Sequence, residues 1–405
     1  MTVKPWEFFF VFYLHMCKNC CTFAAAKVFM KELPAYTPDF EEYIRQGEPD
    51  QKERAQIWRT AIGLQQVDGL ETSEYLREVA RQHIEGDITL KDVKSLIDSY
   101  YKTEDARNSE DAEDKQEADK VSGRIAELLS QKTFTFSPAQ LIAIHRHLFQ
   151  GIYKFAGKIR DYNITKKEWV LRGETVYYAS ADTIRETLDY DFGREKEFDY
   201  SSVSMSDAIS HLTLFCRDIW QIHPFGEGNT RTTAVFMIKY LHTLGFDVNN
   251  NLFAENSWYF RNALVRANYK NVPQGVDYSP IFLERFFRNL LLGENHPLLN
   301  REMHLDWKTP SSTPSSTPAS SQNQFETGNE NVVRLMRALG HEKLSVKDLM
   351  ERVGLKDRMN FMEYSLNPAI DTGFVRMLYP EKPKHPRQKY LLTVKGIGWY
   401  NEHKA

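Results

Sequence analysis

The chain has 405 residues, of which 41% are hydrophobic and 13% aromatic, and its formal net charge is −3. This is a globular composition with enough residues for two or three domains. The near-neutral charge argues against a protein coated with basic residues for nucleic acid, although it leaves room for a local patch. Only four cysteines occur, so we expect no disulfide framework and predict a reducing, cytoplasmic location.

The first 29 residues differ in character from the rest. An apolar and aromatic run, WEFFFVFYL, begins at Trp6 and is too short to span a bilayer. Three cysteines follow it, but no second Cys/His pair completes a tetrahedral metal site. We therefore predict that residues 1–29 are a non-native or disordered extension and that translation begins at Met30.

Residues 50–104 are predicted to form a small helical module. Apolar residues recur at three- and four-residue steps from Ile57 onward. A second helix is expected to begin at Ser73 and to end near Gly86, and a third to begin at Thr89.

The largest predicted domain spans residues 120–295 and is mainly α. Between its helices, residues 169–178 are predicted to form a short β-hairpin, because WVL and TVYY flank an Arg-Gly-Glu turn. Helical periodicity covers residues 121–129, 138–149, 205–221, 231–244 and 258–267.

The remainder divides into a linker and a second domain. Residues 307–330 are rich in Ser, Thr and Pro and cannot form a core, which predicts a linker. Residues 331–405 contain three predicted helices, then strands at 374–379 and 388–393. Three helices and a basic hairpin are typical of a winged helix.

Residues 222–240, IHPFGEGNTRTTAVFMIKY, carry the chemistry. An amphipathic helix is expected to end near His223, because Pro224 discourages its continuation. Gly226 and Gly228 keep the following loop compact and let its backbone approach a ligand closely.

A new helix begins directly after this loop, with Asn229 or Thr230 as its cap. Free backbone N–H groups and a helix N-terminus together favour a bound anion such as phosphate. Arg231 adds a fixed positive charge, and Glu227 supplies the hard oxygen ligand that Mg²⁺ prefers. His223 can take a proton near neutral pH. This set of groups is what nucleotidyl or phosphoryl transfer requires.

These residues resemble the signature of the Fic (filamentation induced by cAMP) family, His-Pro-Phe-x-Asp/Glu-Gly-Asn-Gly-Arg-x-x-Arg. The resemblance extends over residues 120–295 and implies a helical Fic core with the hairpin as its flap. The flap would align a target segment by strand addition. The matching residues are His223, Pro224, Phe225, Glu227, Gly228, Asn229 and Arg231, and the expected flap residues are Val170, Leu171, Val176 and Tyr177.

Most family members transfer AMP from ATP to a Ser, Thr or Tyr hydroxyl of a target protein. By this resemblance, His223 deprotonates the hydroxyl and Glu227 holds Mg²⁺ on the phosphates, with ATP and Mg²⁺ as the implied donor and cofactor. The residues expected to bind the nucleotide are Gly226, Glu227, Gly228, Asn229, Thr230 and Arg231.

Two departures from the signature keep alternatives open. Thr230 replaces its second glycine, and Ala234 replaces its second arginine. Losing that arginine removes a charge-assisted phosphate contact of about 1.5–3 kcal/mol. The alternatives to a protein nucleotidylyltransferase are a phosphotransferase on the same core and a DNA-binding regulator with a degenerate Fic core.

Residues 64–69, LQQVDG, resemble the inhibitory helix of Fic regulators, which is patterned Ser/Thr-x-x-x-Glu-Gly. In the family, that Glu pairs with the second signature arginine. Here Asp68 is one methylene shorter, Leu64 replaces the hydroxyl residue and Ala234 cannot pair. Our hypothesis is an antitoxin-like module whose inhibitory contact with the active site, the brake, is weakened or rewired, with Asp68 as the inhibitory residue. The alternative is that this segment is an ordinary packing helix.

The C-terminal domain favours a second kind of partner. From His341 to Ala405 there are twelve Lys/Arg and eight Asp/Glu. A basic wing can contact DNA phosphates, and DNA is therefore the alternative partner to a hydroxyl-bearing target protein. No membrane association is expected, and a homodimer remains an open alternative to a monomer. The basic residues clustered in the expected wing are Lys382, Lys384, Arg387 and Lys389.

Overall fold

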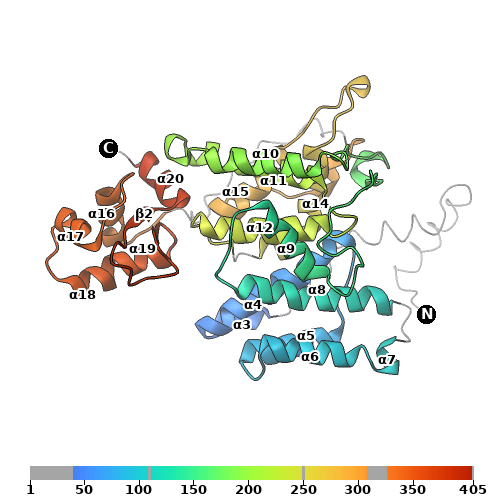
Figure 1. The fold of residues 1–405 in the computed structure, drawn as a ribbon, viewed down its shortest axis with the longest axis horizontal. Helices are drawn as coiled ribbons and strands as arrows, with labels where there is room; N and C mark the ends of the chain where they lie inside the picture. The colour runs from blue at the N-terminus through green and yellow to red at the C-terminus, as the bar shows by residue number, and fades with distance from the viewer. Residues whose placement is uncertain (1–39, 108–110, 249–250, 308–325, 404–405) are drawn as a thin grey trace, which may run out of the picture. The chain divides into compact units, whose positions relative to one another are not determined.

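The computed structural model describes residues 40–107, 111–248, 251–307 and 326–403 (Figure 1). The extension predicted over residues 1–29 and most of the predicted linker lie outside these ranges. Within them the secondary structure is helical apart from two short strands, which confirms the mainly α prediction. None of the described helices has the length and apolarity needed to cross a membrane.

The N-terminal helices agree with the sequence-based boundaries. Ser73 and Thr89 each accept a backbone N–H at the start of a helix, and Gly86 ends the first of these helices in the left-handed region. The elements are α3 (Glu41–Gln46), α4 (Pro49–Gly63), η2 (Leu64–Asp68), α5 (Glu74–Glu85), α6 (Leu90–Tyr100) and α7 (Glu104–Arg107).

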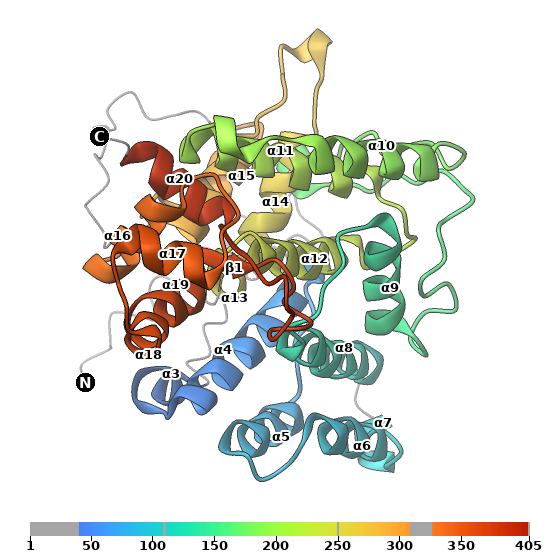
Figure 2. The ribbon, with the colours of Figure 1, turned by 60° about the vertical axis from the view of Figure 1, so that its left-hand side comes forward.

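The helices of the predicted central domain form the core. α8 lies between α5 and α6 on one side and α9 and α12 on the other (Figures 1 and 2). These elements are α8 (Ala112–Ser130), α9 (Pro138–Phe149), η3 (Trp169–Leu171), α10 (Ile184–Glu197), η4 (Tyr200–Ser202), α11 (Met205–Ile222), α12 (Asn229–Thr243), α13 (Leu252–Glu255), α14 (Ser257–Ala267), η5 (Val272–Gln274), α15 (Ile281–Leu292) and η6 (Asn300–Met303).

The central element is α12, which is buried on every side from Asn229 to Leu241. It contacts α8, α9, α11 and η2. A helix that is apolar or packed all round belongs in the interior of a protein. The loop before α12 is therefore attached to a helix that cannot move without disturbing the core.

The N-terminal module packs directly against this core. Trp58 of α4 is fully buried, and α4 contacts α8 and α13. At Gly63 a Cβ would lie 2.4 Å from the Cα of Ala254, so only glycine allows α4 and α13 to approach this closely. This packing places η2 beside α12 and α14.

The β-hairpin predicted over residues 169–178 is wrong as a β ladder. Trp169–Leu171 form the 3₁₀ turn η3, and no strand pairs with them among the described residues. The neighbours Val170 and Leu171 are both fully buried, whereas successive strand residues face opposite sides. The chain still reverses direction, since the Glu168 N–H donates to the Glu174 carbonyl over 2.9 Å.

The C-terminal domain contains the predicted three helical segments and hairpin. Val375 pairs with Leu392 in an antiparallel register, and a further bridge joins Leu344 to Tyr390. The elements are α16 (Glu330–Leu339), α17 (Val346–Val353), α18 (Arg358–Phe361), the π-helical turn η7 (Met362–Leu366), α19 (Asn367–Asp371), β1 (Val375–Met377), β2 (Tyr390–Leu392) and α20 (Val394–Glu402).

Candidate active site

The loop between α11 and α12 begins at His223, which is the first residue after α11. Its backbone is left-handed, with φ 49° and ψ 59°, a conformation that costs energy in a non-glycine residue. Arg160 holds it there: its Nε donates to the His223 carbonyl over 2.8 Å, and its Nη1 and Nη2 donate to the carbonyls of Tyr162 and Ala179. Arg160 therefore ties the loop to residues 162–179.

The imidazole of His223 has the tautomer that a base requires. Its Nδ1 lies 3.1 Å from the Trp220 carbonyl, an acceptor, so Nδ1 carries the proton and Nε2 keeps its lone pair. Burial lowers the pKa of His223 well below its usual value, and the nearby Lys166 ammonium acts in the same direction. The ring packs at a tilt of 32° against that of Tyr178, with the ring centroids 4.1 Å apart, and it is neutral at neutral pH.

Asn229 and Gly228 fix the rest of the loop. The Asn229 amide accepts the Phe225 N–H over 3.0 Å and donates to the Phe225 carbonyl over 2.7 Å. Gly228 has φ 77°, and a Cβ there would lie 2.4 Å from the ring of Phe149. The Asn229 side chain thus closes the loop, while α12 begins at its backbone and directs a helix N-terminus at the site.

His145, on α9, supports this loop and was missed by sequence reasoning. It is fully buried, it stacks on Phe225 at 3.7 Å, and its Nε2 lies 3.0 Å from the Glu227 carbonyl. Its Nδ1 accepts the Gly157 N–H over 2.8 Å, which fixes the proton on Nε2. A single histidine on an amphipathic helix gives no local signal of such a role.

We expect the protein to lose stability on acidification because His145 must stay neutral. Burial lowers its pKa to about 4, with the charge of Arg231 acting in the same direction, against 6.5 for an ordinary histidine. Below pH 6.5 the imidazole of His145 is protonated in the unfolded chain but stays neutral in the folded chain. The neutral His145 therefore contributes about 3 kcal/mol to the free energy of unfolding above pH 6.5, and this contribution is lost as the pH falls toward 4.

Denaturant unfolding of the wild type and of His145→Gln across pH 4–8 measures this effect. The glutamine variant lacks the titrating group, so its free energy of unfolding should fall less over the same window. Parallel curves for the two proteins would show that His145 is not the group responsible.

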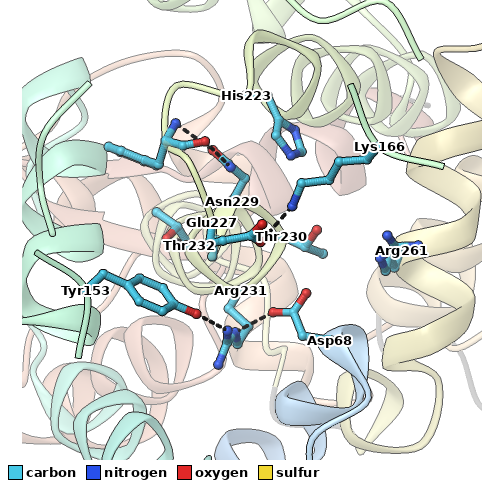
Figure 3. A network of polar contacts seen from close by, with 12 residues as sticks. Asp68, Tyr153, Lys166, His223, Glu227, Asn229, Thr230, Arg231, Thr232 and Arg261 are labelled. Atoms are coloured by element: carbon cyan, nitrogen blue, oxygen red, sulfur yellow. Dashed lines mark hydrogen bonds and ion pairs between the residues drawn. The ribbon is translucent and has the colours of Figure 1, made fainter. Parts of the chain in front are cut away.

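Glu227 reaches outward from the loop. Its side chain is 52% exposed, and one of its oxygens lies 2.7 Å from the Nζ of Lys166 (Figure 3). No cluster of three or more His, Cys, Asp or Glu side chains with metal-binding geometry exists among the described residues. One accessible carboxylate, already balanced by a cation, fits Mg²⁺ bound between a protein oxygen and substrate phosphates.

Arg231 points away from the loop and is buried beneath it. Its Nη2 lies 2.6 Å from Glu117 Oε1, and its Nη1 donates to Gln65 over 3.0 Å. Its Nε lies 2.7 Å from Asp68 Oδ2 in an ion pair whose N–H is not aimed at the oxygen (Figure 3). Burial disfavours the charge of Arg231, but Asp68 and Glu117 outweigh it and the pKa is raised. The predicted phosphate ligand is therefore held by protein carboxylates.

The two departures from the motif both lie in the core. Thr230 is 5% exposed, and its hydroxyl accepts the Trp220 Nε1–H over 3.0 Å. Ala234 is fully buried. The Thr230 side chain therefore braces α11 and does not project into the site that the helix N-terminus faces.

The predicted flap residues divide by exposure. Val170, Leu171 and Val176 are buried and cannot offer side chains to a target, whereas Tyr177 is 80% exposed. Behind them, buried Glu168 accepts two hydrogen bonds from Arg261, over 2.7 and 3.1 Å. An open pocket of about 710 Å³ lies beside this segment, lined by residues that include Lys166, Glu174, Tyr177, Tyr269 and Asn271.

Curated and solved proteins resemble parts of the chain. A probable protein adenylyltransferase, y4lH, from Sinorhizobium fredii (strain NBRC 101917 / NGR234) is 28% identical over 126 residues. That match covers 31% of this chain and 62% of y4lH, so the chain spans about three fifths of this relative's length. A Fic family protein from Desulfovibrio desulfuricans G20 matches with a TM-score of 0.39 and 20% identity, over 92% of this chain and 97% of that chain. The N-terminal FIC domain of Bep8, a VirB-translocated effector protein from Bartonella sp. 1-1C, matches with a TM-score of 0.33 and 16% identity, over 50% of this chain and 87% of that chain.

Family models match two parts of the chain. Residues 135–241 match the Fic/DOC family, and this range contains His223, Glu227 and the loop between them. Residues 330–393 match the C-terminal domain of Fic-like (filamentation induced by cAMP) proteins. The chain therefore carries a Fic/DOC domain followed by a Fic-like C-terminal domain.

Proposed function

We propose that the protein transfers a nucleotide from a nucleoside triphosphate to a hydroxyl group of a target protein, with AMP from ATP as the transferred group. The observation that carries this proposal is the neutral, buried His223, whose Nε2 keeps its lone pair and which begins the loop that leads through Glu227 to the N-terminus of α12. The description of y4lH as a probable protein adenylyltransferase supports the same reaction.

In this mechanism His223 Nε2 accepts the proton of the target hydroxyl. The hydroxyl oxygen forms a bond to the α-phosphorus, the bond from that phosphorus to the bridging oxygen breaks, and pyrophosphate leaves with the electron pair. The backbone N–H groups at the start of α12 stabilise the negative charge on the α-phosphate. Mg²⁺ held by Glu227 would neutralise part of the phosphate charge.

Residues 162–179 would position the target. Arg160 holds the carbonyls of Tyr162 and Ala179 in place, and the exposed Tyr177 is next in sequence to Tyr178, which packs against the His223 ring. We propose that the target lies along this segment through Tyr177, since Val170, Leu171 and Val176 are buried.

We further propose that Asp68 acts as a brake on the site. Together with Glu117 it pairs with Arg231, the signature arginine that the reaction needs for a phosphate. This is a rewired form of the expected inhibitory contact, because Ala234 has replaced the second arginine. Release of Arg231 would then accompany nucleotide binding.

The decisive experiment uses ATP labelled at either the α or the γ position, with Mg²⁺, the purified protein and a cell extract as the source of targets. Label arriving on protein from the α position, and absent with His223→Ala, supports nucleotidyl transfer. Label from the γ position alone would replace this proposal with a phosphotransferase. The same measurement with the other nucleoside triphosphates identifies the preferred donor.

A second candidate function, DNA binding, is favoured by the position of the basic residues in the C-terminal domain. Lys382, Lys384, Arg387 and Lys389 are all exposed and lie between β1 and β2, where the wing of a winged helix would be. An exposed cluster of this kind suits contacts with the phosphate backbone.

If the wing binds DNA, replacing Lys384 and Arg387 with alanine should reduce the dependence of affinity on salt. Each lost phosphate contact lowers the slope of log affinity against log salt by about 0.9, so the pair should lower it by about 2. Fluorescence anisotropy with a labelled duplex measures the slope. Lys91 and Lys94, exposed on α6, provide the matched control, and equal slopes for both double variants would dismiss DNA binding by the wing.

A further inference from the structure

Helix α12, which carries the end of the Fic signature, supplies little positive charge to a bound triphosphate. Ala234 stands fully buried where the Fic signature has its second arginine. Arg231 is buried and paired with Asp68 and Glu117. Phosphoryl and nucleotidyl transfer depend on positive groups that balance the charge of the phosphates. While these carboxylates hold Arg231, and with no arginine at position 234, an additional cation must come from another part of the fold.

Three cations of the described chain lie close enough to His223 to lower its pKa, and their partners differ. Arg160 donates to backbone carbonyls from all three of its nitrogens. Arg261 is bound by both oxygens of Glu168, which is buried. Among the described residues, the ammonium group of Lys166 has one ion-pair partner, Glu227, and this pair is partly exposed to solvent.

The Lys166–Glu227 pair is well placed for exchange. The side chains are 26% and 52% exposed, and exposed ion pairs contribute little to stability. The backbone of Lys166 is nevertheless fixed, since its N–H donates to the Thr175 hydroxyl over 3.1 Å. Its ammonium group points into the space between His223 and Glu227 (Figure 3). Because the lysine side chain is flexible while its backbone is fixed, its ammonium group can move from a carboxylate to a nearby phosphate.

We propose that Lys166 binds the phosphates of the nucleotide and supplies the charge that Ala234 cannot. This inference rests on the proposed function, because the phosphates must lie between the base His223 and the carboxylate of Glu227. On binding, the Lys166 ammonium leaves Glu227 for a phosphate oxygen, and Glu227 is released toward the cation that accompanies the nucleotide. Residues 162–179 thereby contribute to donor binding as well as to target binding.

Calorimetric titration with ATP and with adenosine, in EDTA, tests the proposal without catalysis or metal. Lys166→Ala should weaken ATP binding about 10- to 150-fold, the range for loss of a charge-assisted hydrogen bond, and should leave adenosine binding unchanged. Lys166→Arg keeps the charge and should retain most of the ATP affinity. Lys167→Ala, a change at the exposed neighbouring residue, is the matched control and should bind ATP like the wild type.

Equal ATP affinity of Lys166→Ala and the wild type would overturn the proposal. So would an equal loss of ATP and adenosine binding, because that pattern indicates a structural role. Absence of ATP binding by the wild type would overturn both this proposal and the proposed function. If the wild type binds ATP through Lys166 but transfers no α label to protein, only the proposed function fails and the assignment of Lys166 stands.

Discussion

Replacing His223 with alanine is expected to lower nucleotidyl transfer by about 10²- to 10⁴-fold, the usual contribution of a general base. The affinity for ATP should stay close to that of the wild type, since no phosphate contact is assigned to the imidazole. The rate of α-label transfer at saturating ATP, compared with the dissociation constant of ATP, separates the two effects. A rate loss caused by misfolding would also weaken ATP binding and so raise the dissociation constant.

The acid limb of the pH–rate profile tests the same assignment. Because burial and nearby cations lower the pKa of His223, the base stays neutral and active as the pH falls below 6.5. Transfer should decline only at more acidic pH, where the ring becomes protonated. His147→Ala is a suitable control, because the ring of His147 on α9 pairs with Glu127 of α8 over 3.0 Å. A midpoint near 6.5 in the wild type would contradict the buried, neutral histidine.

Helix boundaries followed closely from local sequence. The expected helix at 138–149 is α9, and the N-caps at Ser73 and Thr89 are formed as predicted. The reason is that periodicity and capping are properties of neighbouring residues. The prediction of a β-hairpin at 169–178 was wrong, because apolar composition cannot distinguish a strand from a segment that buries consecutive residues in a core.

The site was predicted less completely than the fold. The motif places His223, Glu227 and the start of α12 together, because all three are encoded within nine residues. The supports of the loop come from elsewhere: His145 lies 82 residues from Glu227, and Arg160 lies 63 residues from His223. Contacts of such separation depend on tertiary packing, which no local pattern in a single sequence records.

The pairing of Arg231 shows the same limit in a functional contact. The inhibitory-helix resemblance identified Asp68, but it implied a partner at position 234, where this chain has alanine. The structure pairs Asp68 with Arg231, 2.7 Å away, and adds Glu117 from α8. Glu117 lies in the charge-rich stretch of residues 105–119, which has the composition of an ordinary solvated surface, so no local pattern singled it out.

Neutralising both carboxylates, by Asp68→Asn with Glu117→Gln, is expected to destabilise the nucleotide-free protein by about 3–5 kcal/mol. Arg231 is 1% exposed and would keep its charge without a compensating anion. Guanidinium unfolding of the double variant and the wild type, without nucleotide, measures the loss.

Adding ATP distinguishes a brake from a purely structural ion pair. If Arg231 exchanges carboxylates for a phosphate, ATP should stabilise the double variant more than the wild type, because only the wild type must break ion pairs to bind it. A ligand at 100 times its dissociation constant stabilises a protein by about 2.7 kcal/mol, so a tighter-binding variant gains more at equal ATP. The rate of α-label transfer at subsaturating ATP should rise as well.

Asp119→Asn provides the matched control for this experiment. Asp119 is a fully buried carboxylate of α8 that accepts hydrogen bonds from the Ser73 N–H and the Tyr101 hydroxyl, over 2.9 and 2.7 Å. Its replacement should also destabilise the protein but should leave the response to ATP unchanged. If the double variant and Asp119→Asn respond to ATP as the wild type does, the Asp68–Arg231–Glu117 contacts hold the N-terminal module on the core and do not restrain the nucleotide site.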